Sequence, residues 1–347
     1  MRAIRVLKKG DCRSEPDVLV LSDDVEPPTL VPTGNELLVR VLTCSVNAGD
    51  VKLMTGALSL PGKTATLPYT PGLEVCGVVE AVGAKVNTFQ IGDRIIAAVR
   101  PHAVGGGGMA EHVVVESGLA AKVPSTLSPL SAVSLPLAGV MALQAIKDVN
   151  IQKDSKVIVL GASSAVGSMI VQLAKHAGAV FIAGTTTEER LTSTLPLDLV
   201  IVDDNKHDKW WDVLQGKELD VVIDCLGEAN AWRHADKTLK SSGAYATLLG
   251  DLLSDGDVKA TTQMISMGLV NMWKAFWRAS PKFKMVSAFP STALLGEVIE
   301  RVVDGTITPL IDSNSPLGFK TEALQQAVVL QRGQQVSGKL VMQISEA

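Results

Sequence analysis

The chain has 347 residues and a net charge of −4 at pH 7, with 46% hydrophobic and 20% charged residues. Its length favours two domains of ordinary size, and its composition is that of a globular protein without the basic excess typical of nucleic-acid binding. No uninterrupted apolar run approaches the ~20 residues of a membrane span and no signal-peptide pattern opens the chain, so we expect a cytoplasmic protein without membrane contact.

Short β-rich runs separated by glycine and proline occupy residues 36 to 123. They read "ELLVRVLTCSV", "EVCGVVEAVG", "DRIIAAV" and "EHVVV" in chain order. Closely spaced strands with turn signals between them predict a compact β-barrel or sandwich-like domain.

After this β-rich half, strands alternate with helical segments. "KVIVL" is followed by a helix from Val166 to His176, and then by "AVFIAG", "DLVIVDD", "LDVVIDCLG" and "GAYATLLG". This alternation predicts a parallel, doubly wound sheet, an architecture that binds nucleotides. The terminal "GKLVMQI" is strand-like, and we expect it to rejoin the first domain. The predicted domains are residues 1–128 completed by 288–347, and residues 129–287.

The segment "SKVIVLGASSAVGSMIVQLAKHAGA" has the layout of a dinucleotide-binding βαβ unit. The three glycine positions of its turn fall to Ala162, Ser164 and Gly167, so only the third is glycine. The helix N-terminus still offers free N–H groups and a positive dipole end to a phosphate. An ordinary helix N-cap at Ser163 or Ser164 is the alternative, which the βαβ context disfavours. We expect the pyrophosphate to contact Ser163, Ser164, Ala165 and Val166, with both serine hydroxyls helping the backbone.

The second strand of this unit lacks a carboxylate near its end. Gly184, Thr185 and Thr186 stand where an NAD site usually carries Asp or Glu for the ribose 2′-hydroxyl. Hydroxyl groups and the guanidinium of Arg190 suit a 2′-phosphate, which a carboxylate would repel. The sequence therefore favours NADPH as the cofactor.

The ends of two later strands supply further candidates for the cofactor site. Leu226 lies in "DCLGE", and Leu248 and Leu249 lie in "YATLLGD". Strand ends form the ligand crevice of open α/β sheets, so these leucines are expected to line the cofactor. The alternative is that they are only turn residues.

Six segments together resemble a known family. They are "VNAGDVKLMTG", "LPYTPGLEVCGVVEAVG", "FQIGDRI", "LPLAGVMALQAI", "GASSAVGSMIVQLAKHAGA" and "SGKLVM", in family order along nearly the whole chain. On these segments the chain resembles the zinc-independent quinone oxidoreductase branch of the medium-chain dehydrogenase/reductase superfamily. The resemblance implies an α/β fold, with a GroES-like β-rich domain from both termini around a doubly wound Rossmann domain with a parallel sheet. It also implies NADPH in the cleft and a homodimer.

Zinc-dependent relatives in this superfamily hold their catalytic metal with a cysteine and the histidine of G-H-E. The corresponding positions here look like Asn47 and Leu73, and leucine cannot bind zinc. The cysteines, Cys12, Cys44, Cys76 and Cys225, stand singly, so we expect neither a structural zinc lobe nor a disulfide framework. These substitutions favour metal-free hydride transfer from NADPH to a quinone or an α,β-unsaturated carbonyl.

In similar reductases the stretch from Asn47 to Lys52 lies beside the nicotinamide. The resemblance implies that Asn47 hydrogen-bonds the ribose or carboxamide. Asp50 and Lys52 are two residues apart, so on an extended segment they would share a face and could pair. Lys52 is then the candidate proton donor or electrostatic clamp for the reduced oxygen. The alternatives are a turn residue at Asp50 and a solvated surface lysine.

Two departures from the family pattern leave questions open. Met141 replaces a threonine that relatives place near the nicotinamide, and Asp203 replaces a tyrosine or histidine near the adenosine phosphate. A carboxylate there would oppose a 2′-phosphate unless it points away, so the degree of preference for NADPH stays open. An enoyl-thioester reductase, or a dinucleotide-binding sensor or structural protein with little turnover, are the alternative functions.

Overall fold

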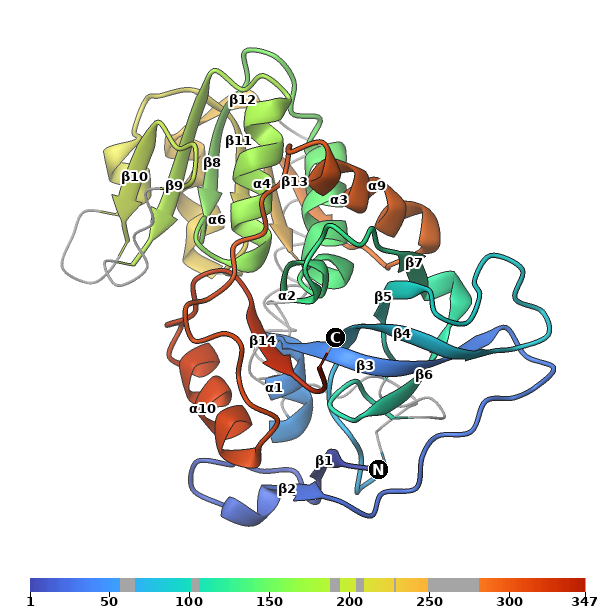
Figure 1. Cartoon of the computed structure of the whole chain (residues 1–347). Coiled ribbons are helices and arrows are strands. Elements are labelled where there is room, and N and C mark those ends of the chain that lie inside the picture. The colour runs from blue at the N-terminus through green and yellow to red at the C-terminus, as the bar shows by residue number, and fades with distance from the viewer. Residues whose placement is uncertain are drawn as a thin grey trace. The chain divides into compact units, whose positions relative to one another are not determined.

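The computed structural model describes residues 1–56, 66–100, 106–187, 194–203, 209–227, 229–248 and 281–346. The chain forms two compact units (Figure 1): Met1–Val140, Phe289–Asp304 and Pro309–Ala347 make the first, and Met141–Ala288 and Gly305–Thr308 make the second. Residues 129–140, which the sequence analysis places in the second domain, pack with the first unit. One reason is local, because the hydroxyl of Thr43 donates a hydrogen bond to the carbonyl of Pro129 at 3.0 Å.

An antiparallel sheet in the order β14-β3-β4-β5-β7 forms the first unit, and β6 also pairs with β3. Its strands are β3 (Glu36–Val46), β4 (Glu74–Val82), β5 (Arg94–Ala98), β6 (His112–Glu116), β7 (Ala120–Lys122) and β14 (Leu340–Gln343), and a separate pair joins β1 (Ala3–Val6) to β2 (Leu19–Ser22). Strand β14 lies beside β3 with Leu340 opposite Val46 (Figure 1). This pairing confirms that the final strand rejoins the first domain.

Strand β3 runs from the rim of the first unit into its core. Its first residues alternate between buried and half-buried, as expected for a strand with one face on the core. From Val41 to Val46 every residue is buried, because β14 and β4 pair with it on either side. The strand therefore delivers the next residue, Asn47, to the edge of a well-packed core.

Helices complete the first unit around this sheet. They are α1 (Ala48–Thr55), α2 (Pro129–Ala132), α9 (Thr292–Val303) and α10 (Thr321–Arg332), with the short helices η1 (Pro16–Val18), η2 (Ser117–Leu119) and η3 (Leu135–Gly139). Helix α9 packs against η3 so closely that a Cβ on Gly139 would lie 2.5 Å from Val298. A larger residue at position 139 would force the side chain of Val298 to shift.

A parallel sheet in the order β10-β9-β8-β11-β12-β13 forms the second unit. Its strands are β8 (Lys156–Leu160), β9 (Phe181–Thr186), β10 (Leu199–Val202), β11 (Leu219–Asp224), β12 (Leu239–Leu248) and β13 (Lys282–Val286), and its helices are α3 (Val140–Val149), α4 (Ala165–His176), α5 (Trp210–Val213), α6 (Ala229–His234) and η5 (Ala235–Lys237). Strands β8, β9 and β10 follow one another towards one edge of the sheet, and β11, β12 and β13 follow one another towards the other edge. This order confirms the predicted doubly wound sheet and puts its switch point between β8 and β11.

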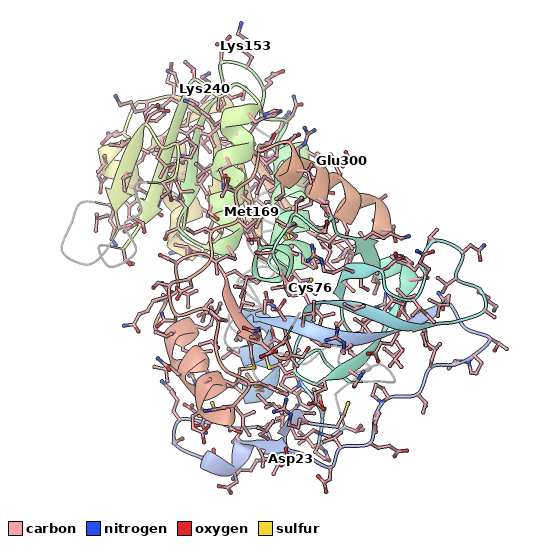
Figure 2. All side chains as sticks on the ribbon, in the orientation of Figure 1. Asp23, Cys76, Lys153, Met169, Lys240 and Glu300 are labelled. Carbon is pink, nitrogen blue, oxygen red and sulfur yellow. The ribbon has the colours of Figure 1, made fainter. Side chains whose placement is uncertain are left out.

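The two ends of this parallel sheet can be told apart by their side chains. Lys153, just before β8, and Lys240, near the start of β12, project from the same end (Figure 2). Met169 on α4 is buried. The carboxyl ends of the strands, where doubly wound sheets bind their ligands, are at the opposite end from the two lysines.

Among the described residues, one helical run, Pro129–Val149, has the length and composition to cross a membrane. In the sequence this run is not uninterrupted, because serine, glutamine, lysine and aspartate stand among its apolar residues. Of its most apolar window, 61% is buried inside the protein, as in the core helix of a globular fold.

Candidate functional site

The turn between β8 and α4 is tight and closely packed. Gly161 has φ +74°, and its N–H donates to the hydroxyl of Thr185 at 2.9 Å. A Cβ on Gly167 would lie 2.2 Å from the carbonyl oxygen of Gly161, so helix and strand meet where the sequence analysis expects the third glycine. The positive φ lies at Gly161, one residue before Ala162, to which the sequence analysis gave the tight turn. Glycine is favoured at that φ because it has no Cβ.

Both serine hydroxyls of this turn bond inside the protein. Ser164 caps α4, and its Oγ accepts a hydrogen bond from the N–H of Gly167 at 3.0 Å. Ser163 is buried, and its Oγ accepts from the hydroxyl of Thr186 at 2.9 Å. Among the described residues no acceptor faces the N–H groups of Ala165 and Val166, which are half-buried. These two amides are the donors that the turn offers to an anion.

The predicted cofactor residues on neighbouring strands have different surroundings. Leu226 is half-buried and lies against Gly161, where a Cβ would meet its Cδ2 at 2.7 Å. Leu248 is buried at the end of β12, and Met141 is half-buried at the start of the second unit. Arg190 and Leu249 lie outside the described residues.

Asp224, which the sequence analysis did not single out, fixes the turn that carries Leu226. Its Oδ1 accepts hydrogen bonds from the N–H groups of Leu226 at 2.8 Å and Gly227 at 2.9 Å, and its Oδ2 accepts from the hydroxyl of Tyr245 at 2.7 Å. Burial raises the pKa of this carboxyl, and these hydrogen bonds oppose the rise. The segment "DCLG" offered the signal, an acidic residue where a buried strand ends.

In the first unit, Asn47 and Asp50 form a capping box at the start of α1. Asp50 is 1% exposed, and its Oδ2 accepts from the N–H of Asn47 at 2.9 Å while its Oδ1 accepts from the N–H of Gly72 at 2.9 Å. Burial raises the pKa of Asp50 to about 6, with the nearby charge of Glu74 adding to the rise and the hydrogen bonds opposing it. The expectation of an extended segment is wrong, because this capping box starts a helix at Ala48.

Lys52 therefore does not share a face with Asp50. Residues two apart on a helix point in different directions, and here Asp50 is buried while Lys52 is half-buried. The carboxylate of Asp50 bonds to Asn47 and Gly72 instead. On α1, Lys52 lies one turn beyond Ala48, so it is close to the helix start but on a more exposed side.

A buried ion pair joins the start of β14 to the start of β4. Nζ of Lys339 lies 2.6 Å from Oε1 of Glu74, and these side chains are 5% and 0% exposed. The hydroxyl of Ser45 donates to the same carboxylate oxygen, and the N–H of Leu137 donates to Oε2 at 2.8 Å. The pair is thus enclosed by hydrogen bonds, which is what a buried charge requires.

This ion pair determines how the Asn47 amide is oriented. Oδ1 of Asn47 accepts a hydrogen bond from Nζ of Lys339 at 2.5 Å. Its Nδ2 donates to Oγ of Ser45 at 3.1 Å and to Oδ2 of Asp50 at 3.2 Å. The sequence analysis missed Ser45, Glu74 and Lys339, although all three lie in strand-like segments that it quoted. These residues lie so far apart in the chain that their contacts could not be predicted from sequence spacing.

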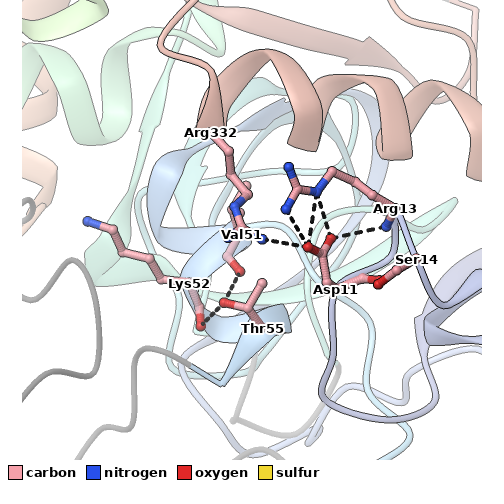
Figure 3. Close-up of polar contacts among 7 residues, drawn as sticks. All are labelled: Asp11, Arg13, Ser14, Val51, Lys52, Thr55 and Arg332. Carbon is pink, nitrogen blue, oxygen red and sulfur yellow. Dashed lines mark hydrogen bonds and ion pairs between the residues drawn. The ribbon is translucent and has the colours of Figure 1, made fainter.

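Figure 3 shows the last turn of α1 and a separate cluster of ion pairs around Asp11. The hydroxyl of Thr55 donates to the carbonyls of Val51 at 3.0 Å and Lys52 at 3.2 Å. Arg332, at the end of α10, bonds to Asp11 at 3.0 Å, and Arg13 bonds to the same carboxylate. These hydrogen bonds, chiefly those from Arg13, lower the pKa of Asp11. Lys52 extends away from this cluster (Figure 3).

The donor set at the start of α1 does not fit a catalytic zinc ion. Leu73 offers no donor atom, and the oxygen of Asn47 already accepts a hydrogen bond from the ammonium of Lys339. Across the described ranges of the chain, no three His, Cys, Asp or Glu side chains gather in a group that could hold a metal.

Two family models match the chain: the alcohol dehydrogenase GroES-like domain at residues 33–125 and the zinc-binding dehydrogenase at residues 165–289. A quinone oxidoreductase of Lama guanicoe is 31% identical over 255 residues, which are 72% of this chain and 73% of the relative. The NADPH-dependent alkenal/one oxidoreductase, chloroplastic, of Arabidopsis thaliana is 30% identical over 245 residues, which are 69% of this chain and 61% of the relative.

Among solved structures, the quinone oxidoreductase from Coxiella burnetii aligns with a TM-score of 0.78 and 22% sequence identity, covering 99% of both chains. At this identity the likeness shows the fold alone. The family models and the two sheets confirm the predicted fold class, a GroES-like β-rich domain with a doubly wound Rossmann domain.

Proposed function

Because the chain belongs to the quinone oxidoreductase branch of the medium-chain dehydrogenase/reductase superfamily, we propose that it transfers hydride from NADPH to quinones or α,β-unsaturated carbonyls without a metal ion. Family membership makes the chain an oxidoreductase that binds a nicotinamide dinucleotide. The choice of NADPH and of the acceptor class is our proposal, and the names of the two relatives support it. The homodimer and the cytoplasmic location remain predictions.

The hydrogen bond from Lys339 to the Asn47 oxygen is the observation that best supports metal-free chemistry. A zinc-dependent mechanism needs an open metal position with ligands on either side to polarise an oxygen. Leu73 cannot be such a ligand, and the ammonium of Lys339 is hydrogen-bonded to the Asn47 oxygen. Without a Lewis acid the acceptor must itself be electron-poor, as quinones and conjugated carbonyls are.

The turn between β8 and α4 would hold the pyrophosphate of the cofactor. The N–H groups of Ala165 and Val166 would bind it, and the positive end of the α4 dipole adds to the attraction. Leu226, held by Asp224, and Leu248 would line the same side of the sheet. When bound, NADPH supplies the hydride, and the protein supplies position and charge.

Three residues of the α1 segment would serve the acceptor side of the reaction. Asn47 would face the nicotinamide, and the capping box with Asp50 fixes its position, so Asp50 acts as a positioning residue. Nζ of Lys52 would give a proton to the acceptor oxygen after hydride has added to the acceptor, or would stabilise the negative charge there. Its half-buried place on α1 supports this role, whereas Asp50 is too deeply buried to reach a substrate.

The experiment that tests this function measures oxidation of NADPH, and of NADH alongside, by the chelator-treated enzyme. The acceptors are a panel of quinones, enones and one enoyl thioester. We expect turnover that survives chelation, with NADPH preferred and a quinone or enone as the best acceptor. Activity lost on chelation would contradict the metal-free mechanism, and activity confined to the thioester would identify an enoyl-thioester reductase. NADPH that protects the fold against heat without any turnover would indicate a sensor or structural protein.

A further inference from the structure

An ion pair marks the carboxyl end of strand β10. Nζ of Lys209 lies 2.8 Å from Oδ1 of Asp203, and these side chains are 38% and 11% exposed. The carboxylate that the sequence analysis regarded as an obstacle to a 2′-phosphate therefore has its own cation. This pair lies outside the site described at α1.

The pair is adjacent to the end of strand β9, where the adenosine ribose is expected. Strands β9 and β10 are parallel neighbours with Val202 opposite Thr186, and the N–H of Asp203 donates to the carbonyl of Thr186 at 3.0 Å. The hydroxyl of Thr186 in turn donates to Oγ of Ser163 in the turn before α4. A continuous set of hydrogen bonds thus leads from the proposed pyrophosphate site through Thr186 and Asp203 to Lys209.

The charges at this position decide which ribose it accepts. A carboxylate alone at the end of the second or third strand accepts a hydrogen bond from a 2′-hydroxyl and repels a 2′-phosphate. An ammonium group carries three donors, so one lysine can bridge a carboxylate and a phosphate. Lys209 is more exposed than Asp203, which leaves the cation as the outer charge of the pair.

We propose that Lys209 determines the preference for NADPH over NADH, by neutralising Asp203 and by binding the 2′-phosphate. This inference rests on the proposed function, because it requires the adenosine end of a nicotinamide dinucleotide to lie at β9. It assigns to Lys209 the task that the sequence analysis gave to Arg190.

A matched ion pair at the opposite end of the same sheet provides the control. Nζ of Lys240 lies 2.6 Å from Oδ1 of Asp220, and these side chains are 37% and 31% exposed. Lys240 projects from the end where the strands begin (Figure 2). Lys240→Gln therefore makes the same change in net charge, and removes a lysine of similar exposure from an ion pair, far from the proposed ribose.

The test is titration calorimetry of the full chain with NADPH and with NADH. For Lys209→Gln we expect the Kd of NADPH to rise about 10-fold or more, as for loss of a charge-assisted hydrogen bond, and the Kd of NADH to change by less than about 3-fold. Lys240→Gln should leave both constants unchanged. Asp203→Asn should shift the preference further towards NADPH, because it removes the carboxylate and keeps the cation.

Several outcomes would overturn the inference. Equal weakening of NADPH and NADH by Lys209→Gln, or an equal effect of Lys240→Gln, would show a general charge effect or a structural one. If Lys209→Gln melts well below Lys240→Gln, the double variant Asp203→Asn/Lys209→Gln is tested instead, because it leaves no unpaired carboxylate. This double variant must lose the preference for NADPH. If it keeps that preference, the role assigned to Lys209 is refuted. A wild-type chain that binds neither cofactor overturns the proposed function itself, whereas normal NADPH binding with an insensitive Lys209 overturns only this inference.

Discussion

Lys339 and Glu74 form a buried ion pair, 2.6 Å from nitrogen to oxygen, that joins the last strand of the chain to the middle of the first unit. Lys339 also orients Asn47, and Glu74 also accepts hydrogen bonds from Ser45 and Leu137. The same interaction therefore stabilises the fold and fixes the residue proposed to face the nicotinamide. Residues from both ends of the chain are needed to build the start of α1.

Removing one partner of this pair should lower the stability of the fold by more than expected from the pair's own contribution, and removing both partners should be less harmful than the two single losses together. We expect Lys339→Met or Glu74→Gln to lower the free energy of unfolding by about 3–5 kcal/mol, because each leaves a charged or hydrogen-bonding group buried without its partner. The double variant should lose clearly less than the sum of the single losses. Denaturant unfolding of the four proteins measures this.

Lys122 in the same unit supplies the control for these measurements of Glu74 and Lys339. It pairs with Asp93 at 2.9 Å, but its side chain is 52% exposed. Lys122→Met should cost less than about 1 kcal/mol, as is usual for exposed ion pairs. Strict additivity of the Glu74 and Lys339 effects would show that the two groups do not interact in solution.

The raised pKa of Asp50 predicts a specific dependence of stability on pH. The native chain keeps this proton up to pH about 6, whereas the unfolded chain releases it near the usual value of 3.8. Between these values the native state binds more protons, so this group's contribution to the free energy of unfolding falls as pH rises, by up to about 1.4 kcal/mol per pH unit. Above pH about 6 the contribution is constant.

Asp50→Asn removes this titration, so the difference between variant and wild type isolates it. Relative to Asp50→Asn, the wild type should become less stable as the pH is raised from about 5 to about 6, and the difference should then level off. Unfolding curves at several pH values test this. A difference that stays constant across that range would contradict a raised pKa.

The two tyrosines of the chain should respond in opposite ways to loss of their hydroxyl groups. Tyr69 is buried, and in the described part of the chain no partner faces its hydroxyl, whose pKa is raised by burial and by the charge of Asp50. Tyr245 donates to Asp224 at 2.7 Å. Tyr69→Phe should stabilise the first unit by roughly 1 kcal/mol, and Tyr245→Phe should destabilise the second by about 1.5–3 kcal/mol. Thermal melts of the full chain carrying each substitution distinguish the two effects. A loss of stability in Tyr69→Phe would point to a buried water on that hydroxyl.

The role of Lys52 can be resolved with a pair of substitutions. Arginine keeps the charge but does not give up its proton, so Lys52→Arg retains a clamp and loses a proton donor. If Lys52 donates the proton, both Lys52→Met and Lys52→Arg should lower kcat by about 100-fold or more, with the Kd of NADPH unchanged. If Lys52 acts as an electrostatic clamp, only Lys52→Met should lower kcat. Lys153→Met, at the end of the parallel sheet where the strands begin, is the control. If Lys52→Met is as active as Lys153→Met, Lys52 is only a surface residue.

Much of the fold was predictable from the sequence because it depends on local patterns. The alternation of strand and helix from "KVIVL" onwards is repeated often enough to predict a parallel sheet, and Gly167 lies at the predicted close contact between strand and helix. The tight turn lies at Gly161, one residue before the position predicted from the spacing of the motif, although a glycine at the end of a buried strand is itself a signal for a positive φ.

The candidate site was less predictable because its contacts are distant in sequence. A two-residue spacing suggested that Asp50 and Lys52 pair, but the capping box at Asn47 starts a helix and separates them. Glu74 and Lys339 meet only because β14 returns to β3. Similarly, residue type alone does not show that the Asp203 carboxylate forms an ion pair with Lys209.

Two substitutions of Ser164, the N-cap of α4, test whether the cofactor pyrophosphate lies at this turn. Asparagine and aspartate both cap helices as well as serine does, so both variants should fold with unchanged or higher Tm. Only aspartate places a negative charge against the phosphates. Calorimetry with NADPH should therefore show near-normal binding to Ser164→Asn and no measurable binding to Ser164→Asp, and equal affinity for the two variants would contradict this placement of the cofactor.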